Sequence, residues 1–297
     1  MKLHITTNYL KYSIATLLVV FSISGFGQCK VSTDWFIPAS NSTQKNAAFL
    51  KTLPTRGYVL LGEHHANQSH HQWQLRIIQA LYKKQKNMAI GLEMLPRDKQ
   101  HVLNDWINGK ISKAELQQKS DWRNYWSANF ADYFPILEYA REKHIPLYAL
   151  NISDSLNQKI QQSGWESVPD NQREGVGNYA RPLRKYVRKL AKSFTRHVVP
   201  GQPIDKVAFL HFVQQQLVWD RAMAEKLTET YQQKKLALVV GLMGSWHIID
   251  KEGVPFQLQD LKQKHITTLV PWSQYFNCDA VSASFADAIY GMSKSKH

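Results

Sequence analysis

Short apolar runs alternate with long helical patterns along most of this chain, and that alternation limits the folds it can adopt. Runs with the length and composition of buried strands occupy residues 58–61, 88–92, 146–150, 236–240 and, less clearly, 266–270. Helical patterns occupy residues 69–84, 96–107, 113–119, 133–143 and 205–231. Strands that are apolar throughout and separated by helices are typical of a parallel sheet covered on both faces. The pattern predicts an α/β fold with a parallel β-sheet flanked by helices.

The alternation is interrupted once, between residues 165 and 200. This stretch has no strand pattern and contains prolines and glycines before a helical pattern at 182–196. The proline that opens this pattern is well placed, because the first turn of a helix leaves its amides unpaired. We therefore expect a small all-helical insertion at 161–200, with the sheet domain built from residues 50–160 and 201–297. The chain has 297 residues, 43% of them hydrophobic, which is enough to bury the core of such a domain.

Residues 1–28 have the layout of a secretory signal peptide. Lys2 and Lys11 precede an apolar run at 14–23, and small residues follow this run. The run is too short to span a bilayer as a helix. We expect these residues to be removed from a protein that is exported to the periplasm or the cell envelope.

The sequence contains two cysteines, Cys29 and Cys278. Acylation of Cys29 would make the protein a lipoprotein anchored in a membrane, although Phe26-Gly27-Gln28 is a poor version of the sequence that usually precedes such a cysteine. In an oxidising compartment the two cysteines could instead form a disulfide. The residues alone leave both alternatives open, and neither resembles a cysteine metal site.

The chain is strongly basic, with a formal net charge of +14 and a pI of about 9.6. This balance favours anionic partners, although solvated lysines and arginines on helix faces would give the same excess. Because an exported protein does not meet the chromosome, we do not expect nucleic acid as a partner. The remaining candidate partners are small molecules with carboxylates or phosphates, and anionic lipid.

Polar side chains stand where several of the predicted strands end. Glu63 and His65 follow the first strand, Glu93 ends the second, Asn151 follows the third, and His247 comes shortly after the fourth. Ligands of open parallel sheets bind beyond the carboxyl ends of the strands. The sequence therefore predicts that these five side chains share one pocket.

The carboxylates and imidazoles of this pocket suggest a metal site. Glu63, His65, Glu93 and His247 would suit Zn²⁺ or Mn²⁺ better than Ca²⁺. A hydrogen-bonded cluster without metal explains the same residues equally well.

Other residues near the strand ends have expected roles as well. His71 lies two turns along the helix that follows the first strand, so we place it in the pocket, whereas His64 and His70 are expected to cap backbone groups or face solvent. Arg97 follows Glu93 by four residues and is the expected partner of its carboxylate. Gln216, Asp220 and Met223 are spaced to share one face of the helix at 205–231, and Trp219 lies beside them. We expect this face to form a polar, hydrated wall of the pocket.

Several motifs occur together in a fixed order over residues 55–256. They are Gly62-Glu63-x-His65-x-Asn67-x-x-His70-His71, Gly91-Leu92-Glu93-Met94-x-x-Arg97, Pro135-Ile136-Leu137-Glu138-Tyr139-Ala140-Arg141, Ile145-Pro146-Leu147 with Ala149-Leu150-Asn151, Gln216-x-x-Trp219-Asp220-x-x-Met223-Ala224, and Gly244-Ser245-x-His247. In these motifs the chain resembles the ChaN-like haem-binding lipoproteins, within the group that includes Tiki-type proteases and erythromycin esterases. The resemblance implies a parallel-sheet domain with a smaller helical part, and haem binding in iron uptake at the cell envelope. The insertion matches the family least.

The helix at 182–196 is the expected haem surface. Arg184 and Arg188 begin a basic stripe of four residues spaced four apart, and apolar side chains occupy the other side of the helix. Haem needs an apolar slot for its ring, cations for its two propionates and a ligand for ferric iron. Tyr179 and Tyr186 are the nearest candidate ligands, with His197 as a weaker third.

Three functions are consistent with these features. The first is a haem carrier or receptor, with haem as its cofactor. Such a protein could also form a homodimer. The second is a metal-dependent hydrolase that uses the Glu/His pocket, since members of the wider group use a Glu and a Gly-x-x-His motif in catalysis. The third is a structural envelope protein in which the polar strand ends satisfy one another.

Overall fold

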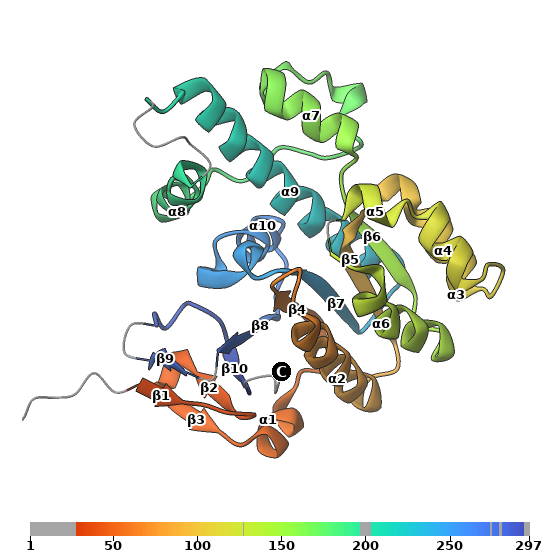
Figure 1. Ribbon diagram of the computed structural model, residues 1–297, viewed down its shortest axis with the longest axis vertical. Coiled ribbons are helices and arrows are strands. Elements are labelled where there is room, and N and C mark those ends of the chain that lie inside the picture. Colours follow the sequence, from red (N-terminus) through yellow and green to blue (C-terminus); the bar gives the residue numbers. More distant parts are fainter. Residues whose placement is uncertain (1–27, 127, 197–202, 274, 279–280, 294–297) are drawn as a thin grey trace, which may run out of the picture.

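The computed structural model describes residues 28–126, 128–196, 203–273, 275–278 and 281–293. Its central feature is an eight-stranded sheet with the strand order β3-β2-β10-β8-β4-β7-β5-β6 (Figure 1). The strands are β3 (Ser42–Gln44), β2 (Trp35–Ile37), β10 (Ala288–Met292), β8 (Ile266–Ser273), β4 (Gly57–Glu63), β7 (Leu238–Gly244), β5 (Met88–Pro96) and β6 (Leu147–Asn151). The α/β fold predicted from the sequence is confirmed.

Six neighbouring strands, from β10 to β6, are parallel, whereas β2 and β3 extend the sheet in antiparallel pairing. We expected a wholly parallel sheet in a domain that begins at residue 50, so β2 and β3 were not expected. Strand β10 lies inside the expected domain, but it was not predicted as a strand. The sequences of the first two explain the omission, because β2 and β3 are three residues long and β3 is largely exposed. Such short segments have neither an apolar run nor a clear alternation to mark them.

The strands in the centre of the sheet are buried on both faces, and successive side chains enter different cores. Val59 and Leu61 of β4 pack in the larger cluster, whereas Tyr58 and Leu60 pack in a second cluster on the opposite face. This division follows from the two-residue period of a strand and explains why these strands read as continuous apolar runs.

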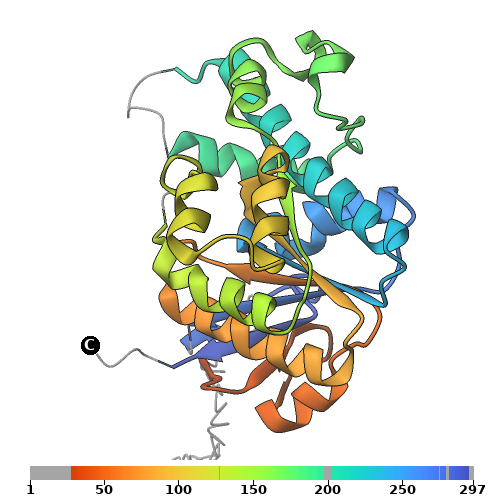
Figure 2. The same ribbon diagram turned by 90° about the vertical axis from the view of Figure 1, so that its right-hand side faces the viewer.

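Helices cover both faces of the sheet (Figure 2). The larger core is closed by helices that include α1 (Asn46–Thr52), α2 (Gln68–Lys84), α3 (Gln100–Ile107), α4 (Lys113–Lys119), α5 (Trp122–Tyr125) and α6 (Phe130–Glu142). The second core is closed by the carboxyl-terminal half of α9 (Lys206–Gln233) and by α10 (Val254–Asp260). Among the described residues, no helix is long and apolar enough to cross a membrane.

The helical part of the molecule is larger than the insertion expected at 161–200. It combines α7 (Asp154–Ser163) and α8 (Arg184–Thr195) with the amino-terminal half of α9. Two small clusters hold it together, one around Trp165 and Val218 and one around Tyr186 and Leu217. Since α9 belongs to this part and to the second core of the sheet, it connects the two.

A second, two-stranded sheet pairs β1 (Gln28–Lys30) with β9 (Tyr275–Asn277). Next to β9, Cys278 is buried and disulfide-bonded, and the sequence holds one other cysteine, Cys29. The expected signal segment lies, apart from residue 28, outside the described residues.

Candidate functional site

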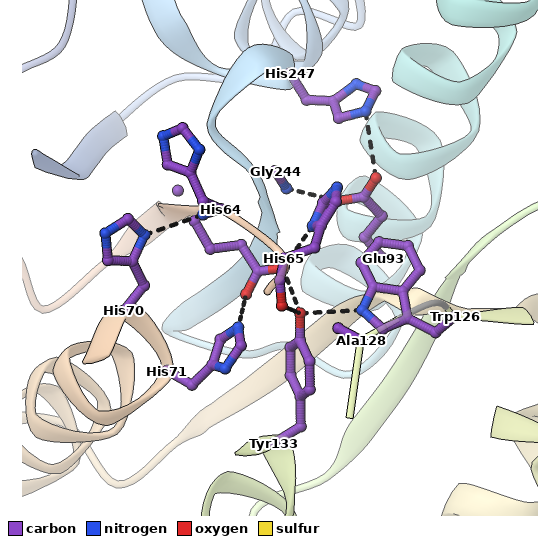
Figure 3. Close-up of polar contacts among 12 residues, drawn as sticks. His64, His65, His70, His71, Glu93, Trp126, Ala128, Tyr133, Gly244 and His247 are labelled. Carbon is purple, nitrogen blue, oxygen red and sulfur yellow. Dashed lines mark hydrogen bonds and ion pairs between the residues drawn. The ribbon is translucent and has the colours of Figure 1, made fainter. Parts of the chain in front are cut away.

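The carboxyl ends of β4, β5, β6 and β7 lie at one edge of the sheet and carry the predicted polar side chains. Glu63 is the last residue of β4, Glu93 lies near the end of β5, and Asn151 ends β6. His247 closes the short helix η5 (Ser245–His247), which follows β7 directly. Glu63, Glu93 and His247 are each less than one-tenth exposed. Figure 3 shows His247 and Gly244 beside Glu93 at this edge.

Glu63 is the centre of the first polar cluster. Its Oε1 accepts hydrogen bonds from the Tyr133 hydroxyl at 2.6 Å and from His65 Nδ1 at 2.8 Å, and its Oε2 lies 2.9 Å from His71 Nε2. Burial alone would raise the pKa of Glu63, but the bonds from His65, His71 and Tyr133 outweigh it and lower the pKa to about 2. Glu63 is therefore ionised and orients His65.

A second cluster runs from Glu93 through His247 and Asp220 to Tyr186. The His247 ring lies between two carboxylates, with Nε2 3.2 Å from Glu93 Oε1 and Nδ1 2.7 Å from Asp220 Oδ1. The Tyr186 hydroxyl donates to Asp220 Oδ2 at 2.5 Å. Burial alone would lower the pKa of His247, but the charges and hydrogen bonds of Glu93 and Asp220 raise it to about 10. His247 is therefore an imidazolium ion at neutral pH.

Gly244 links the two clusters at the end of β7. Its backbone N–H donates to Glu93 Oε2 at 2.6 Å. A Cβ atom at this position would lie 2.8 Å from His65 Cε1, so only glycine lets the His65 ring approach the strand this closely.

These clusters lie beside a cavity of about 550 Å³, which we call the edge cavity. Six of its lining residues were expected from the sequence, namely His65, Glu93, Asn151, Gln216, Trp219 and His247. Sequence analysis missed Tyr125, Trp126 and Trp246, because aromatic residues in loops and short helices carry no periodic signal. The His65 side chain is 41% exposed and its Nδ1 is held by Glu63, so Nε2 is the atom available to accept a proton or bind a ligand.

The expected pairing of Arg97 with Glu93 is wrong. The Arg97 guanidinium donates to the backbone carbonyls of Ala222, at 2.5 Å, and Glu174, at 3.2 Å, and it does not line the edge cavity. Because β5 continues beyond Glu93 to Pro96, Arg97 is carried past the strand end. Burial lowers the pKa of Arg97, and the charges of Glu225, Glu229 and Glu174 oppose that shift.

The expected metal site also finds no support. Within the described part of the chain, no group of three or more His, Cys, Asp or Glu side chains is arranged to hold a metal ion. Glu63 and Glu93 are engaged by imidazoles, a tyrosine hydroxyl and a backbone amide, and both nitrogens of His247 face carboxylates. The hydrogen-bonded alternative accounts for these residues.

A second cavity of about 490 Å³, which we call the α8 groove, lies along the basic side of α8. Its apolar walls are Trp246, Ile249, Trp272 and Phe285. Its cations are Lys185, Arg188, Lys189 and Lys192. His64, Ser245 and Asp250 also line it, and the Asp250 carboxylate lies 3.9 Å from Lys189. The helix was expected to supply both the cations and the apolar slot, but α8 supplies only the cations, and the apolar walls come from residues outside this helix.

Two of the four cations already form ion pairs with the same carboxylate. The buried carboxylate of Glu252 lies 3.2 Å from both Lys185 and Lys189. Arg188 and Lys192 form no ion pair with any described residue. Ser245 also lines the groove, but its hydroxyl is buried and has no hydrogen-bond partner within the described ranges.

The structure separates the residues that were expected to bind haem together. Arg188 lines the α8 groove, whereas Arg184 is exposed and lines none of the described cavities. Tyr186 lines the edge cavity with its hydroxyl bound to Asp220, and Tyr179 lines neither cavity. His197 lies outside the described residues.

His64 and His70 lie at the turn into α2, where the Asn67 side chain caps the helix by accepting from Ser69 N and His70 N. His70 Nδ1 accepts the backbone N–H of His64 at 3.0 Å, which is the structural role expected for His70. His64 was also expected to be structural, but its ring lines the α8 groove, 6.4 Å from the ring of Trp272.

Comparison with known proteins identifies the family. A family model described as haem-binding uptake, Tiki superfamily, ChaN matches residues 49–258. The chain belongs to this family. No curated protein sequence matches significantly.

Solved structures agree with the fold. One similar structure, described as cofacial haem binding to ChaN of Campylobacter jejuni, is 21% identical with a TM-score of 0.68, and the match covers 86% of this chain and 95% of that one. An erythromycin esterase variant in its open conformation is 14% identical with a TM-score of 0.48, covering 81% and 76%. The first of these likenesses supports the fold of this family member.

Proposed function

We propose that this ChaN family member binds haem in the α8 groove as part of haem uptake. The observation that carries the proposal is the composition of the groove, which places free cations and an imidazole beside aromatic walls. Trp246, Trp272 and Phe285 offer flat apolar surfaces for a porphyrin ring. Of the four cations that line the groove, Arg188 and Lys192 form no ion pair with a described residue, which matches the two propionates.

His64 is the proposed axial ligand. Its ring lines the groove, and neither of its ring nitrogens is hydrogen-bonded to a described residue. Tyr186 is a poor ligand, because burial and the charge of Asp220 raise its pKa well above 10 and its hydroxyl is already donated. An imidazole needs no such deprotonation to bind ferric iron.

The edge cavity is less suitable for haem. No lysine or arginine is among the described residues that line it, and Glu93 and Asp154 contribute carboxylates. Propionates placed there would meet like charge, and the His247 cation that lines the cavity is already paired with Glu93 and Asp220. A metal-dependent hydrolase is not proposed, since its metal site is missing from the described residues.

Titration with haemin tests the site. Replacing Arg188→Gln and Lys192→Gln together should weaken haemin affinity by at least about tenfold, because each hydrogen bond to a charged group contributes about 1.5–3 kcal/mol. His64→Ala should shift the Soret band, since the iron loses its proposed nitrogen ligand. The readouts are the Soret spectrum and the dissociation constant.

The matched control is Arg184→Gln with Arg196→Gln. It removes two charges from the same helix at exposed positions that line none of the described cavities. This variant should keep the parent affinity. Two results together would place the haem in the edge cavity instead. Both double variants would have the same haemin affinity, and the Soret spectrum would change in His65→Ala but not in His64→Ala.

A homodimer is part of the proposal. The similar structure from Campylobacter jejuni is described as binding haem cofacially, and two facing haems need two sites brought together. A second copy of this chain is the simplest source of that second site.

We also propose that the protein is exported and that Cys29 is not acylated. The disulfide of Cys278 supports this choice, since a structural disulfide fits an oxidising compartment. Mass spectrometry of envelope-fractionated protein should find a chain without residues 1–27 and without a diacylglyceryl group. An intact Met1 would contradict export, and a lipid-modified Cys29 would contradict the disulfide.

A further inference from the structure

The start of α9 exposes three aliphatic side chains that no described residue covers. Ile204, Val207 and Leu210 are 48%, 60% and 54% exposed, and they are three of the five large hydrophobic residues in the described chain that are classed as exposed. Their spacing of three residues places them along one side of the chain as it enters the helix. Large apolar residues gathered on a surface mark an interaction site more often than isolated ones do.

The opposite side of this helix turn is already occupied. Phe209 and Phe212 turn inward and contact Phe194 of α8, with ring centroids 5.4 Å apart in both pairs. The contact brings the end of α8 beside the beginning of α9. Ile204, Val207 and Leu210 therefore remain outside a packed helix pair and are not needed to close its core.

Exposed cations lie in both segments of this helix pair. Lys192 and Arg196 at the end of α8, and Lys206 at the start of α9, are all exposed. The acidic residue next to Lys206 is Asp205, the N-cap of α9. Its Oδ1 accepts hydrogen bonds from the backbone N–H groups of Val207 and Ala208. From residue 179 to residue 197 the sequence contains no Asp or Glu. The surface thus combines aliphatic groups with net positive charge.

We propose that this surface, which we call the α8–α9 tip, docks on an anionic lipid bilayer. Aliphatic side chains enter the headgroup region while lysine and arginine bind anionic headgroups, and each contribution needs the other for stable binding. A second copy of the chain is a poorer occupant, because it would bring two basic surfaces together. Figure 1 shows this end of α9 beside α8 at one extremity of the molecule, away from α3 and α4, so a flat surface can reach it.

Vesicle sedimentation tests the proposal with the protein as it is recovered from cells. The parent should bind vesicles of phosphatidylcholine mixed with phosphatidylglycerol, bind phosphatidylcholine alone more weakly, and dissociate as salt is raised. Val207→Asp with Leu210→Asp should lower the partition coefficient by about tenfold or more, because both the apolar contact and the charge are damaged. All variants share one amino terminus, so any contribution of that end is common to them.

The matched control is Gln117→Glu with Gln118→Glu on α4. It changes the net charge by the same amount on exposed residues at a distance from the tip, and it should leave vesicle binding unchanged. Haemin affinity should be the same in all three proteins, which shows that the variants fold and separates this inference from the haem site. Equal vesicle binding by the tip variant and the control would overturn the proposal. A second result would also overturn the proposal: a parent protein that does not bind anionic vesicles, together with a dimer that is lost only in the tip variant. The surface would then bind a second copy of the chain.

Discussion

Replacing His247→Asn should lower the free energy of unfolding at neutral pH by about 3–5 kcal/mol, the usual cost of removing one partner from a buried ion pair. His247 is 6% exposed and is the cation between Glu93 and Asp220. Without it, two buried carboxylates face an uncharged amide. Asparagine preserves part of the side-chain volume, so the loss would report charge more than packing.

Thermal unfolding measures this effect, with an expected fall in midpoint of roughly 10 °C. His101→Asn makes the same chemical change at an exposed position on α3 and should alter stability by less than about 0.5 kcal/mol. Acid should partly restore the His247→Asn protein, because protonation of Glu93 removes one unpaired charge. A variant as stable as the parent at neutral pH would mean that the carboxylates are not both ionised.

The stability of the parent protein should be greatest near pH 6.5 and fall on both sides. On the alkaline side, the pKa of His247 is raised from 6.5 to about 10 in the folded state. The folded chain then holds a proton that the unfolded chain has lost, so stability declines as the pH rises from 6.5 toward 10.

Two of the groups that contribute to the acid side are His70 and Glu63. The pKa of His70 is lowered from 6.5 to about 4, chiefly by burial and then by the charge of His64. The pKa of Glu63 is lowered from 4.5 to about 2. In both cases the unfolded chain binds the proton first, so stability is lost as the pH falls from 6.5 through 4 toward 2.

Denaturant unfolding measured across this pH range tests both limbs. His247→Asn should flatten the alkaline limb, and His70→Asn, whose side-chain oxygen can replace Nδ1 as the acceptor from His64 N, should flatten the upper part of the acid limb. A parent that becomes more stable from pH 7 to pH 10 would show that His247 is not held as a cation.

The sequence by itself determined the central strands and the edge at which polar side chains gather. Strands β4, β5, β6 and β7 are buried on both faces, so they appear as uninterrupted apolar runs, and the parallel arrangement places their carboxyl ends together. That is why the residue pattern alone was enough to assign Glu63, Glu93 and Asn151 to one edge. The family resemblance drew on the same residues, because its motifs coincide with those strand ends.

Tertiary structure decided which of these groups meet. Tyr133 binds Glu63 from a position 70 residues away in the sequence. Asp220 contacts His247 from α9, which packs on the face of the sheet opposite to the helix that carries Tyr133. No periodicity encodes such contacts, since they depend on how helices pack. The same reason explains Arg97, which lies close to Glu93 in sequence and yet bonds to the backbone of α9 and Glu174.

The two sides of α8 show the difference most clearly. Sequence spacing placed its basic residues on one stripe and Tyr186 on the other side, and that division holds within the helix. Only packing decided that the basic side borders the α8 groove while Tyr186 turns to Asp220 and the edge cavity. A helix pattern fixes which side chains share a face, but the surroundings of each face depend on residues far apart in the chain, because folding brings them into contact.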